Sequence, residues 1–243
     1  MSMLAVEQAT RRFAGLVAVD TVSFMMREGE ILSLIGPNGA GKTTLFNLIS
    51  GQLKPTSGAI TFRDQNINDL PPHRRAQRGI GRTFQIAKPL IGLTARENVM
   101  VGAFLRHHGH DAAYQKASEV LDEVGLAARA EVPAAELTLS ERRRLEVARA
   151  LALEPALILL DEVMAGLNAT EITHVIALIQ RLNARGVTFL VIEHNLKVVR
   201  AFSQRVIVLD HGALIAEGTA DDVLSDPEVV RAYLGKKHAA GKA

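Results

Sequence analysis

The sequence contains no cysteine and only ten aromatic residues, eight phenylalanines and two tyrosines, among its 243 residues. Without cysteine the chain forms neither a disulfide framework nor a thiolate metal site, which suits a reducing cytosol. It also lacks an apolar run of the ~18 residues that a membrane-spanning helix needs, and the N-terminus lacks the pattern of a signal peptide. We therefore expect a chain that stays in the cytosol but can dock on a partner that does not.

The charged residues nearly balance, with 28 lysines and arginines against 26 aspartates and glutamates, a formal net charge of +2. The basic residues are dispersed, so the sequence pI near 9.0 does not by itself indicate nucleic acid binding. The length is enough for one large domain or for one domain with an inserted subdomain.

The most informative stretch follows directly on an apolar run at residues 31–35. It matches the pattern G-x-x-x-x-G-K-[ST] at every fixed position, with Gly36, Pro37, Asn38, Gly39, Ala40, Gly41, Lys42, Thr43 and Thr44. The apolar run has the length of a buried strand, and the glycines let the loop turn its N–H groups inward at the start of a helix. We expect Lys42 to reach the β- and γ-phosphates of a nucleotide and the Thr43 hydroxyl to bind Mg²⁺.

Two carboxylates, Asp161 and Glu162, follow a second continuous apolar run at residues 156–160. Such a run is typical of a central parallel strand that is buried on both faces. Because ligands of open α/β sheets bind at the carboxyl ends of the strands, the pair points to the same crevice as the glycine loop. One carboxylate then serves Mg²⁺ and the other polarises an attacking water, unless the pair only caps the next helix.

Three further residues are ambiguous when taken singly. Phe13 can stack on an adenine at the edge of a sheet or lie in the core, as most phenylalanines do. Gln85 ends an extended run at residues 79–85, where glutamine is usually solvated. His194 comes just after an apolar strand at residues 187–192, and a histidine there is ordinarily solvated or caps a helix.

The rest of the chain divides by its periodicity. Alternating apolar residues at positions 4–13 and 19–26 predict a pair of strands before the glycine loop. Between residues 94 and 153 the pattern becomes helical, with capping boxes that begin at Thr94 and Thr138. This block is predicted to be a helical subdomain inserted in an α/β domain.

In their order and spacing these features resemble the nucleotide-binding subunits of ABC transporters along essentially the whole chain. The resemblance implies ATP hydrolysis with Mg²⁺, and it makes residues 36–44 the Walker A loop. The other roles that it implies are adenine stacking for Phe13, contact with Mg²⁺ and the attacking water for Gln85, a magnesium ligand at Asp161, the general base at Glu162 and contact with the γ-phosphate for His194.

The resemblance also implies an architecture and partners. The expected fold is a single α/β P-loop ATPase domain over residues 1–243, with an N-terminal antiparallel β subdomain. Its nucleotide-binding core comprises residues 1–86 and 157–243, and its helical insertion comprises residues 87–156. The implied partners are a second ABC ATPase subunit, identical or related, two membrane permeases and, indirectly, a solute-binding protein. The implied location is peripheral, on the cytoplasmic face of the cell membrane.

One element departs from the family pattern. The signature Leu-Ser-Gly-Gly-Gln is replaced by Leu137, Thr138, Leu139, Ser140 and Glu141. Thr138 keeps a hydroxyl at a helix start, where it and Ser140 are expected to face the γ-phosphate held by a partner subunit. Glu141 adds negative charge there, which is reduced if this side chain turns back to cap its own helix. The following D-loop, usually Ser-Ala-Leu-Asp, is also altered, to Ala-Gly-Leu-Asn at residues 165–168.

Together with the segments 81–85 and 226–235, these variants look most like the ATPase subunits of branched-chain amino-acid importers. The related ATPases of lipopolysaccharide export and of urea uptake are the alternatives. Soluble family members that act on nucleic acid or ribosomes carry a coiled-coil insertion or two cassettes, and this chain has neither feature. A small-molecule P-loop kinase would leave the signature segment and His194 without a role.

Overall fold

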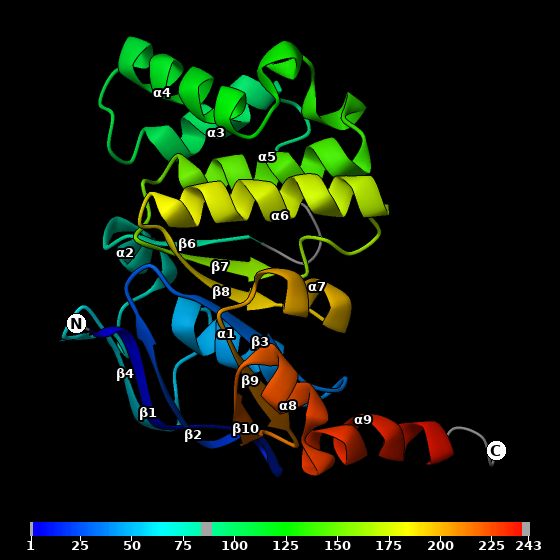
Figure 1. The fold of residues 1–243 in the computed structure, drawn as a ribbon. Helices are drawn as coiled ribbons and strands as arrows, with labels where there is room; N and C mark the ends of the chain where they lie inside the picture. Colours follow the sequence, from blue (N-terminus) through cyan, green and yellow to red (C-terminus); the bar gives the residue numbers. More distant parts are fainter. Residues whose placement is uncertain (1, 84–88, 240–243) are drawn as a thin grey trace. The chain divides into compact units, whose positions relative to one another are not determined.

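The computed structural model describes residues 2–83 and 89–239, with the backbone alone from residue 234 onward (Figure 1). It forms two compact units, one of Met1–Arg75 with Thr188–Ala243 and the other of Ala76–Val187. The chain passes from the first unit to the second within the short helix α2 (Pro72–Gln77). This division by compactness does not test the expected functional boundaries at residues 86/87 and 156/157, which stay a prediction.

The first unit contains an antiparallel sheet in the order β2-β1-β4-β5. Its strands are β1 (Ser2–Phe13), β2 (Leu16–Arg27), β4 (Ser57–Phe62) and β5 (Gln65–Asn66). The predicted strand pair is confirmed, because β1 and β2 pair antiparallel along their whole length. Along β2, buried Val22, Phe24 and Met26 alternate with exposed residues, so one face of this strand is covered.

The first unit also contains strands in the order β10-β9-β3-β8, of which β10 is antiparallel to β9 and the others are parallel. These are β3 (Ile31–Ile35), β8 (Thr188–Ile192), β9 (Arg205–Asp210) and β10 (Ala213–Gly218), with β3 parallel to both β8 and β9. Every residue of β3 and β8 is buried, as the two apolar runs predict for strands covered on both faces. The remaining helices of this unit are α1 (Lys42–Ser50), α7 (Leu196–Phe202), α8 (Ala220–Ser225) and α9 (Pro227–Ala239).

The C-terminal end of α1 is held by Arg75, whose side chain is fully buried. Its guanidinium donates hydrogen bonds to the carbonyl oxygens of Leu48 (2.6 Å), Ile49 (2.7 Å) and Leu70 (2.8 Å). Burial lowers the pKa of Arg75 to about 10, which leaves the group charged at neutral pH. A cation at the negative end of α1 therefore donates to carbonyls of its last turn, of which that of Leu48 also accepts from the N–H of Gly51 (3.4 Å).

Arg75→Met is expected to lower the free energy of unfolding by about 2 kcal/mol, because it leaves several buried carbonyls without a donor. Denaturant unfolding measures the effect, with Arg74→Met as the matched control, since Arg74 is the exposed neighbour on the same helix. Equal stability of the two variants would show that Arg75 does not support α1.

The second unit is mostly helical. It contains α3 (Ala95–Ala103), α4 (His110–Glu123), α5 (Leu139–Leu151) and α6 (Ala169–Ala184), the short turns η1 (Ala127–Arg129) and η2 (Ala134–Glu136), and the parallel strands β6 (Ile80–Arg82) and β7 (Leu157–Asp161). The capping boxes predicted at Thr94 and Thr138 are both present, and Asn168 starts a third that was not predicted. No helix within the described residues is long and apolar enough to cross a membrane.

Candidate functional site

The glycine loop after β3 has a backbone that only glycine can adopt at two of its positions. Gly36 and Gly41 have φ angles of 148° and 100°. A Cβ atom would lie 2.1 Å from the carbonyl oxygen of Leu209 at the first position and 2.3 Å from that of Ala18 at the second. The loop is therefore packed against β9 and β2, and its conformation is fixed before any ligand binds.

The side chain of Lys42 bends back over this loop. Its Nζ donates hydrogen bonds to the carbonyl oxygens of Gly36 (2.6 Å) and Pro37 (2.9 Å), and the residue is only 8% exposed. The N-cap residue of α1 is Gly41, which has no side chain to accept from the N–H groups of the first turn, and Thr43 in that turn is exposed. A fixed ammonium beside an open helix N-terminus is suited to binding a phosphate group.

Phe13, the last residue of β1, is 39% exposed, so it is not an ordinary core phenylalanine. The guanidinium carbon of Arg11 lies 4.6 Å from the centroid of its ring, which fixes one side of the ring by a cation–π contact. The exposed ring offers a face on which a base can stack. Its predicted role in binding adenine stays a prediction.

His194 leaves the parallel sheet at the same edge as the glycine loop. Leu34 of β3 is paired with Ile192 of β8, so Gly36 and His194 each lie two residues beyond paired positions on neighbouring parallel strands, which are ~4.8 Å apart. The cap of the next helix, α7, is supplied by Asn195, whose side chain accepts from the N–H of Lys197. His194 therefore does not cap that helix, and its ring is exposed.

In the second unit Asp161 is the buried last residue of β7. Its Oδ2 lies 3.4 Å from Nη2 of Arg82, and its backbone N–H donates to the hydroxyl of Thr83 (3.2 Å). Burial lowers the pKa of Arg82, and the Asp161 carboxylate opposes that shift. Arg82 and Thr83 were assigned no role from the sequence. The sequence feature that could have indicated their role is a cation followed by a hydroxyl within the extended run at residues 79–85.

Glu162 has a φ angle of 50°, in the left-handed region that costs a non-glycine residue of order 1–3 kcal/mol. The next helix, α6, begins with a capping box. The side chain of Asn168 accepts from the N–H of Glu171, and the side chain of Glu171 accepts from the N–H of Asn168. The carboxylates at 161 and 162 therefore do not cap it, which removes the alternative left open by the sequence. Asn168 of the altered D-loop is thus the N-cap of α6, a position that asparagine and aspartate fill equally well.

Thr138 and Ser140 lie at the N-terminus of α5. Thr138 is exposed, and its hydroxyl accepts from the N–H of Glu141, while Glu141 Oε2 accepts from the N–H of Thr138 (2.9 Å). The prediction that Glu141 turns back to cap its own helix is confirmed. Gln85 lies outside the described residues, so its predicted role stays a prediction.

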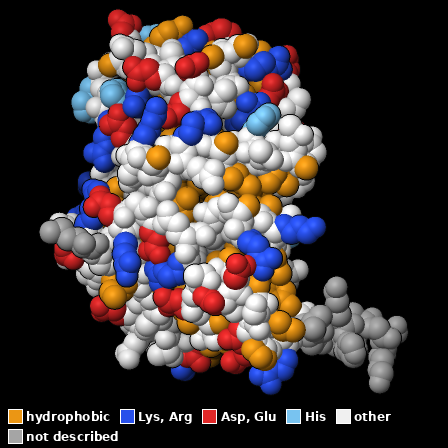
Figure 2. Space-filling model, viewed as in Figure 1, with side chains coloured by type: hydrophobic (Ala, Val, Ile, Leu, Met, Phe, Trp, Pro, Cys, Tyr) orange, Lys and Arg blue, Asp and Glu red, His pale blue; other side chains and the backbone are white. Residues whose placement is uncertain are grey.

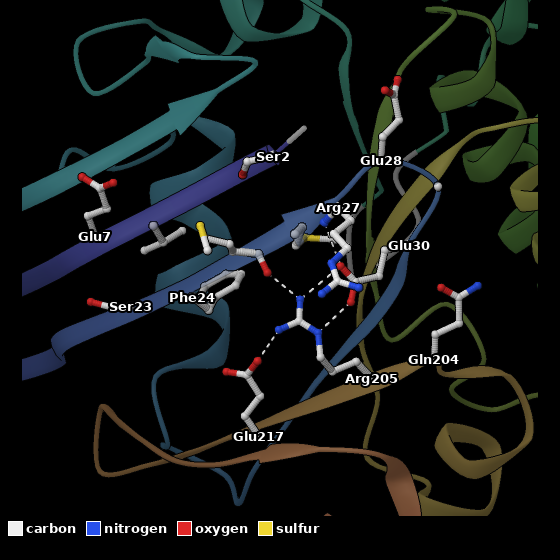
Figure 3. Close-up of a pocket in the computed structure, with 14 residues that line it drawn as sticks. Ser2, Glu7, Ser23, Phe24, Arg27, Glu28, Glu30, Gln204, Arg205 and Glu217 are labelled. Atoms are coloured by element: carbon white, nitrogen blue, oxygen red, sulfur yellow. Dashed lines mark hydrogen bonds and ion pairs between the residues drawn. The ribbon is translucent and has the colours of Figure 1, made fainter.

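The first unit also has an open hollow, shown in Figure 3, which none of the predicted site residues lines. Arg205 forms a bidentate ion pair with Glu30 (2.7 and 3.0 Å) and contacts Glu217 and the carbonyl oxygen of Met25. The hydrogen bonds with Glu30 are the main cause of a raised pKa of Arg205. Because two carboxylates, Glu30 and Glu217, surround the single guanidinium of Arg205, this cluster stabilises the fold rather than offering an anion site. Acidic and basic side chains are also interspersed on the face shown in Figure 2.

Comparisons with known proteins agree on one family. The sequence model of the ABC transporter family matches residues 19–165, more than half of the chain, and a model described as branched-chain amino acid ATP-binding cassette transporter matches residues 213–239. The high-affinity branched-chain amino acid transport ATP-binding protein LivG of Salmonella typhimurium is 40% identical, over 96% of this chain and 98% of its own. The lipopolysaccharide export system ATP-binding protein LptB of Haemophilus influenzae is 36% identical, over 98% of this chain and 99% of its own.

Solved structures give the same result and confirm the predicted fold class. The ADP conformation of MJ1267, an ATP-binding cassette of an ABC transporter, superposes with a TM-score of 0.88 at 32% identity, covering 97% of this chain and 99% of that one. The dimeric post-hydrolysis state of the cassette MJ0796, bound to ADP and Pi, has a TM-score of 0.81 at 29% identity and covers 90% of this chain and 99% of that one.

Proposed function

This chain belongs to the ABC transporter ATP-binding family, the ATP-hydrolysing subunits of transporters, and on that premise we propose that it powers the import of branched-chain or other hydrophobic amino acids. The observation that carries the proposal is the 40% identity with LivG over nearly the whole of both chains. The match of residues 213–239 to the branched-chain amino acid cassette model also favours amino-acid import over lipopolysaccharide export.

The cargo is tested by deleting the gene in its host and measuring uptake of labelled leucine, isoleucine and valine. We expect uptake to fall and to be restored by the wild-type gene but not by a Lys42→Ala copy. Normal uptake together with a failure of lipopolysaccharide assembly would reject amino-acid import in favour of the export alternative.

The residues of the proposed ATP site have distinct roles. The glycine loop and Lys42 bind the β- and γ-phosphates, and Phe13 stacks on the adenine. Thr43, Asp161 and Gln85 provide the oxygen ligands that suit Mg²⁺, which when bound neutralises charge on the phosphates. Fit to a phosphate is supported by the fixed Lys42 ammonium and the open N-terminus of α1.

In the proposed reaction Glu162 accepts a proton from a water molecule as the water oxygen attacks the γ-phosphorus, and the bond from phosphorus to the β–γ bridging oxygen breaks. His194 contacts the γ-phosphate. Thr138 and Ser140 approach the nucleotide of a second cassette, so each site is complete only when two cassettes close. Because phosphoryl transfer depends mainly on positioning and electrostatics, separation of the cassettes stops the reaction, and the isolated chain should be a poor ATPase.

The proposed partners follow from this arrangement. The dimeric state of the related cassette MJ0796 supports pairing with a second ATPase subunit, identical or related. Two membrane permeases would convert closure and hydrolysis into alternating access, and a solute-binding protein would deliver the cargo. The chain would then work as a peripheral subunit on the cytoplasmic face of the cell membrane.

Phe13→Ala is expected to weaken ATP binding by about 1–3 kcal/mol, or about 5- to 150-fold in Kd, because one stacking surface is lost. Phe13→Trp should retain binding and, since the chain has no other tryptophan, should report ATP by a change in fluorescence. Leu16→Ala is the control, because Leu16 is another exposed apolar residue, at the start of β2. Equal Kd values for Phe13→Ala and the wild type would exclude stacking on Phe13.

A further inference from the structure

The altered signature of this chain carries a negative charge that has a specific partner. Nε of Arg129, the last residue of η1, lies 3.0 Å from Oε1 of Glu141. The other carboxylate oxygen, Oε2, accepts from the N–H of Thr138 at the start of α5. The side chain of Glu141 is 15% exposed and that of Arg129 is 41% exposed. The pair therefore lies at the surface, and the carboxylate is more buried than the guanidinium.

The carboxylate stays ionised. Burial raises the pKa of Glu141, but the hydrogen bonds with Thr138 and the charges of Arg129 and Arg144 outweigh that effect, so its pKa lies below the ordinary value. Protonation therefore does not remove the charge at neutral pH. An anion in the first turn of a helix is favourable for that helix. It is unfavourable when the same helix end must approach a triphosphate.

A nearby cation resolves this conflict, and Arg129 lies close enough to act on Glu141 through its charge, without a hydrogen bond between Nε and the carboxylate. Its backbone is fixed by hydrogen bonds of its N–H to the carbonyl of Leu126 (2.9 Å) and of its carbonyl to the N–H of Val132 (3.0 Å). The other cation, Arg144, donates through Nη1 to the carbonyl oxygens of Gly125 (2.8 Å) and Val124 (3.4 Å), so its guanidinium is directed to the end of α4. Arg129 alone of these two forms an ion pair with Glu141.

We propose that Arg129 is a positioning residue of the signature segment, which neutralises Glu141 and holds it on the Thr138 cap so that the start of α5 can close on the triphosphate of a second cassette. The inference rests on the proposed function, because it requires that closure. It assigns a role to a residue outside the signature, and it explains how a glutamate is accepted at position 141.

The test compares Arg129→Gln, Glu141→Gln and the double variant in the full-length protein. The readouts are the ATP concentration for half-maximal turnover and ATP-driven association measured by light scattering. Arg129→Gln is expected to raise the required ATP concentration about tenfold, because the uncovered carboxylate repels the nucleotide. The ATP concentration that the double variant requires should lie within about twofold of that for Glu141→Gln, since no carboxylate charge is left to neutralise. Arg129→Lys should retain most of the wild-type behaviour.

Arg185→Gln is the matched control, because Arg185 also pairs with a glutamate, Glu123, in the same unit but outside the signature. Melting temperatures of all variants separate a folding defect from a positioning defect, and rescue in the double variant is a result that a general loss of stability does not give. If Arg129→Gln behaves as Arg185→Gln, or if the double variant stays as impaired as Arg129→Gln, the role of Arg129 is rejected while the proposed function stands. If the wild-type protein neither binds ATP nor hydrolyses it together with its membrane partners, both are rejected.

Discussion

Glu162→Gln should bind ATP with an affinity close to that of the wild type and hydrolyse it at least about 100-fold more slowly. A general base contributes about 10²- to 10⁴-fold to such reactions, and an amide of the same shape cannot accept the proton of the attacking water. The backbone of Glu162 is in the left-handed region, a conformation that is concentrated at functional sites, and the residue is half-buried. Because ATP then persists, the variant should also accumulate as an ATP-bound dimer.

The matched control for this variant is Glu154→Gln. Glu154 also has a positive φ, 51°, but its carboxylate pairs with Lys116 (3.1 Å) and His107 (3.0 Å) at the end of α5. Turnover should change little in this control. If Glu162→Gln hydrolyses ATP at a near-normal rate, Glu162 is not the base.

Lys42→Ala is expected to weaken ATP binding by at least about 100-fold. The ammonium is already fixed over the loop by two carbonyl oxygens, so little conformational entropy is lost when a phosphate replaces them. A charge-assisted contact in a mostly buried position is also stronger than one in water. Titration of the Phe13→Trp chain, with and without the additional Lys42→Ala change, measures the effect directly.

Lys54→Ala is the control for loss of a lysine. Its side chain is 68% exposed and pairs with Asp69 at 2.9 Å. We expect its Kd for ATP to match that of the wild type. An unchanged Kd in Lys42→Ala would show that the glycine loop does not hold the phosphates through this residue.

Local patterns predicted much of this fold. The apolar runs that became β3, β7 and β8 were recognisable because strands buried on both faces need no polar residues. The caps at Thr94 and Thr138 were recognisable because each capping box is closed within four residues of the chain. Phe13 and His194 were ambiguous from the sequence, because exposure and strand register are properties of the packed sheet.

The cations that support the site were not predicted. Arg82 and Asp161 are 79 positions apart in the chain and meet only because β6 and β7 pair. Arg75 serves carbonyls of α1 that are 26 and 27 positions away. Arg129 reaches Glu141 across the turn between α4 and α5. Their partners are set by tertiary structure, and arginines at such positions look like solvated surface residues in the sequence.

In the proposed dimer, ATP is held between the glycine loop of one cassette and the start of α5 of another. The absence of cysteine allows a direct measurement by cross-linking two single-cysteine proteins, Asn38→Cys and Ser140→Cys, both carrying Glu162→Gln. After mixing and treatment with a short bismaleimide, we expect a cross-linked dimer that contains one copy of each protein and forms only with ATP. No such dimer, or one that forms equally without ATP, would contradict this arrangement.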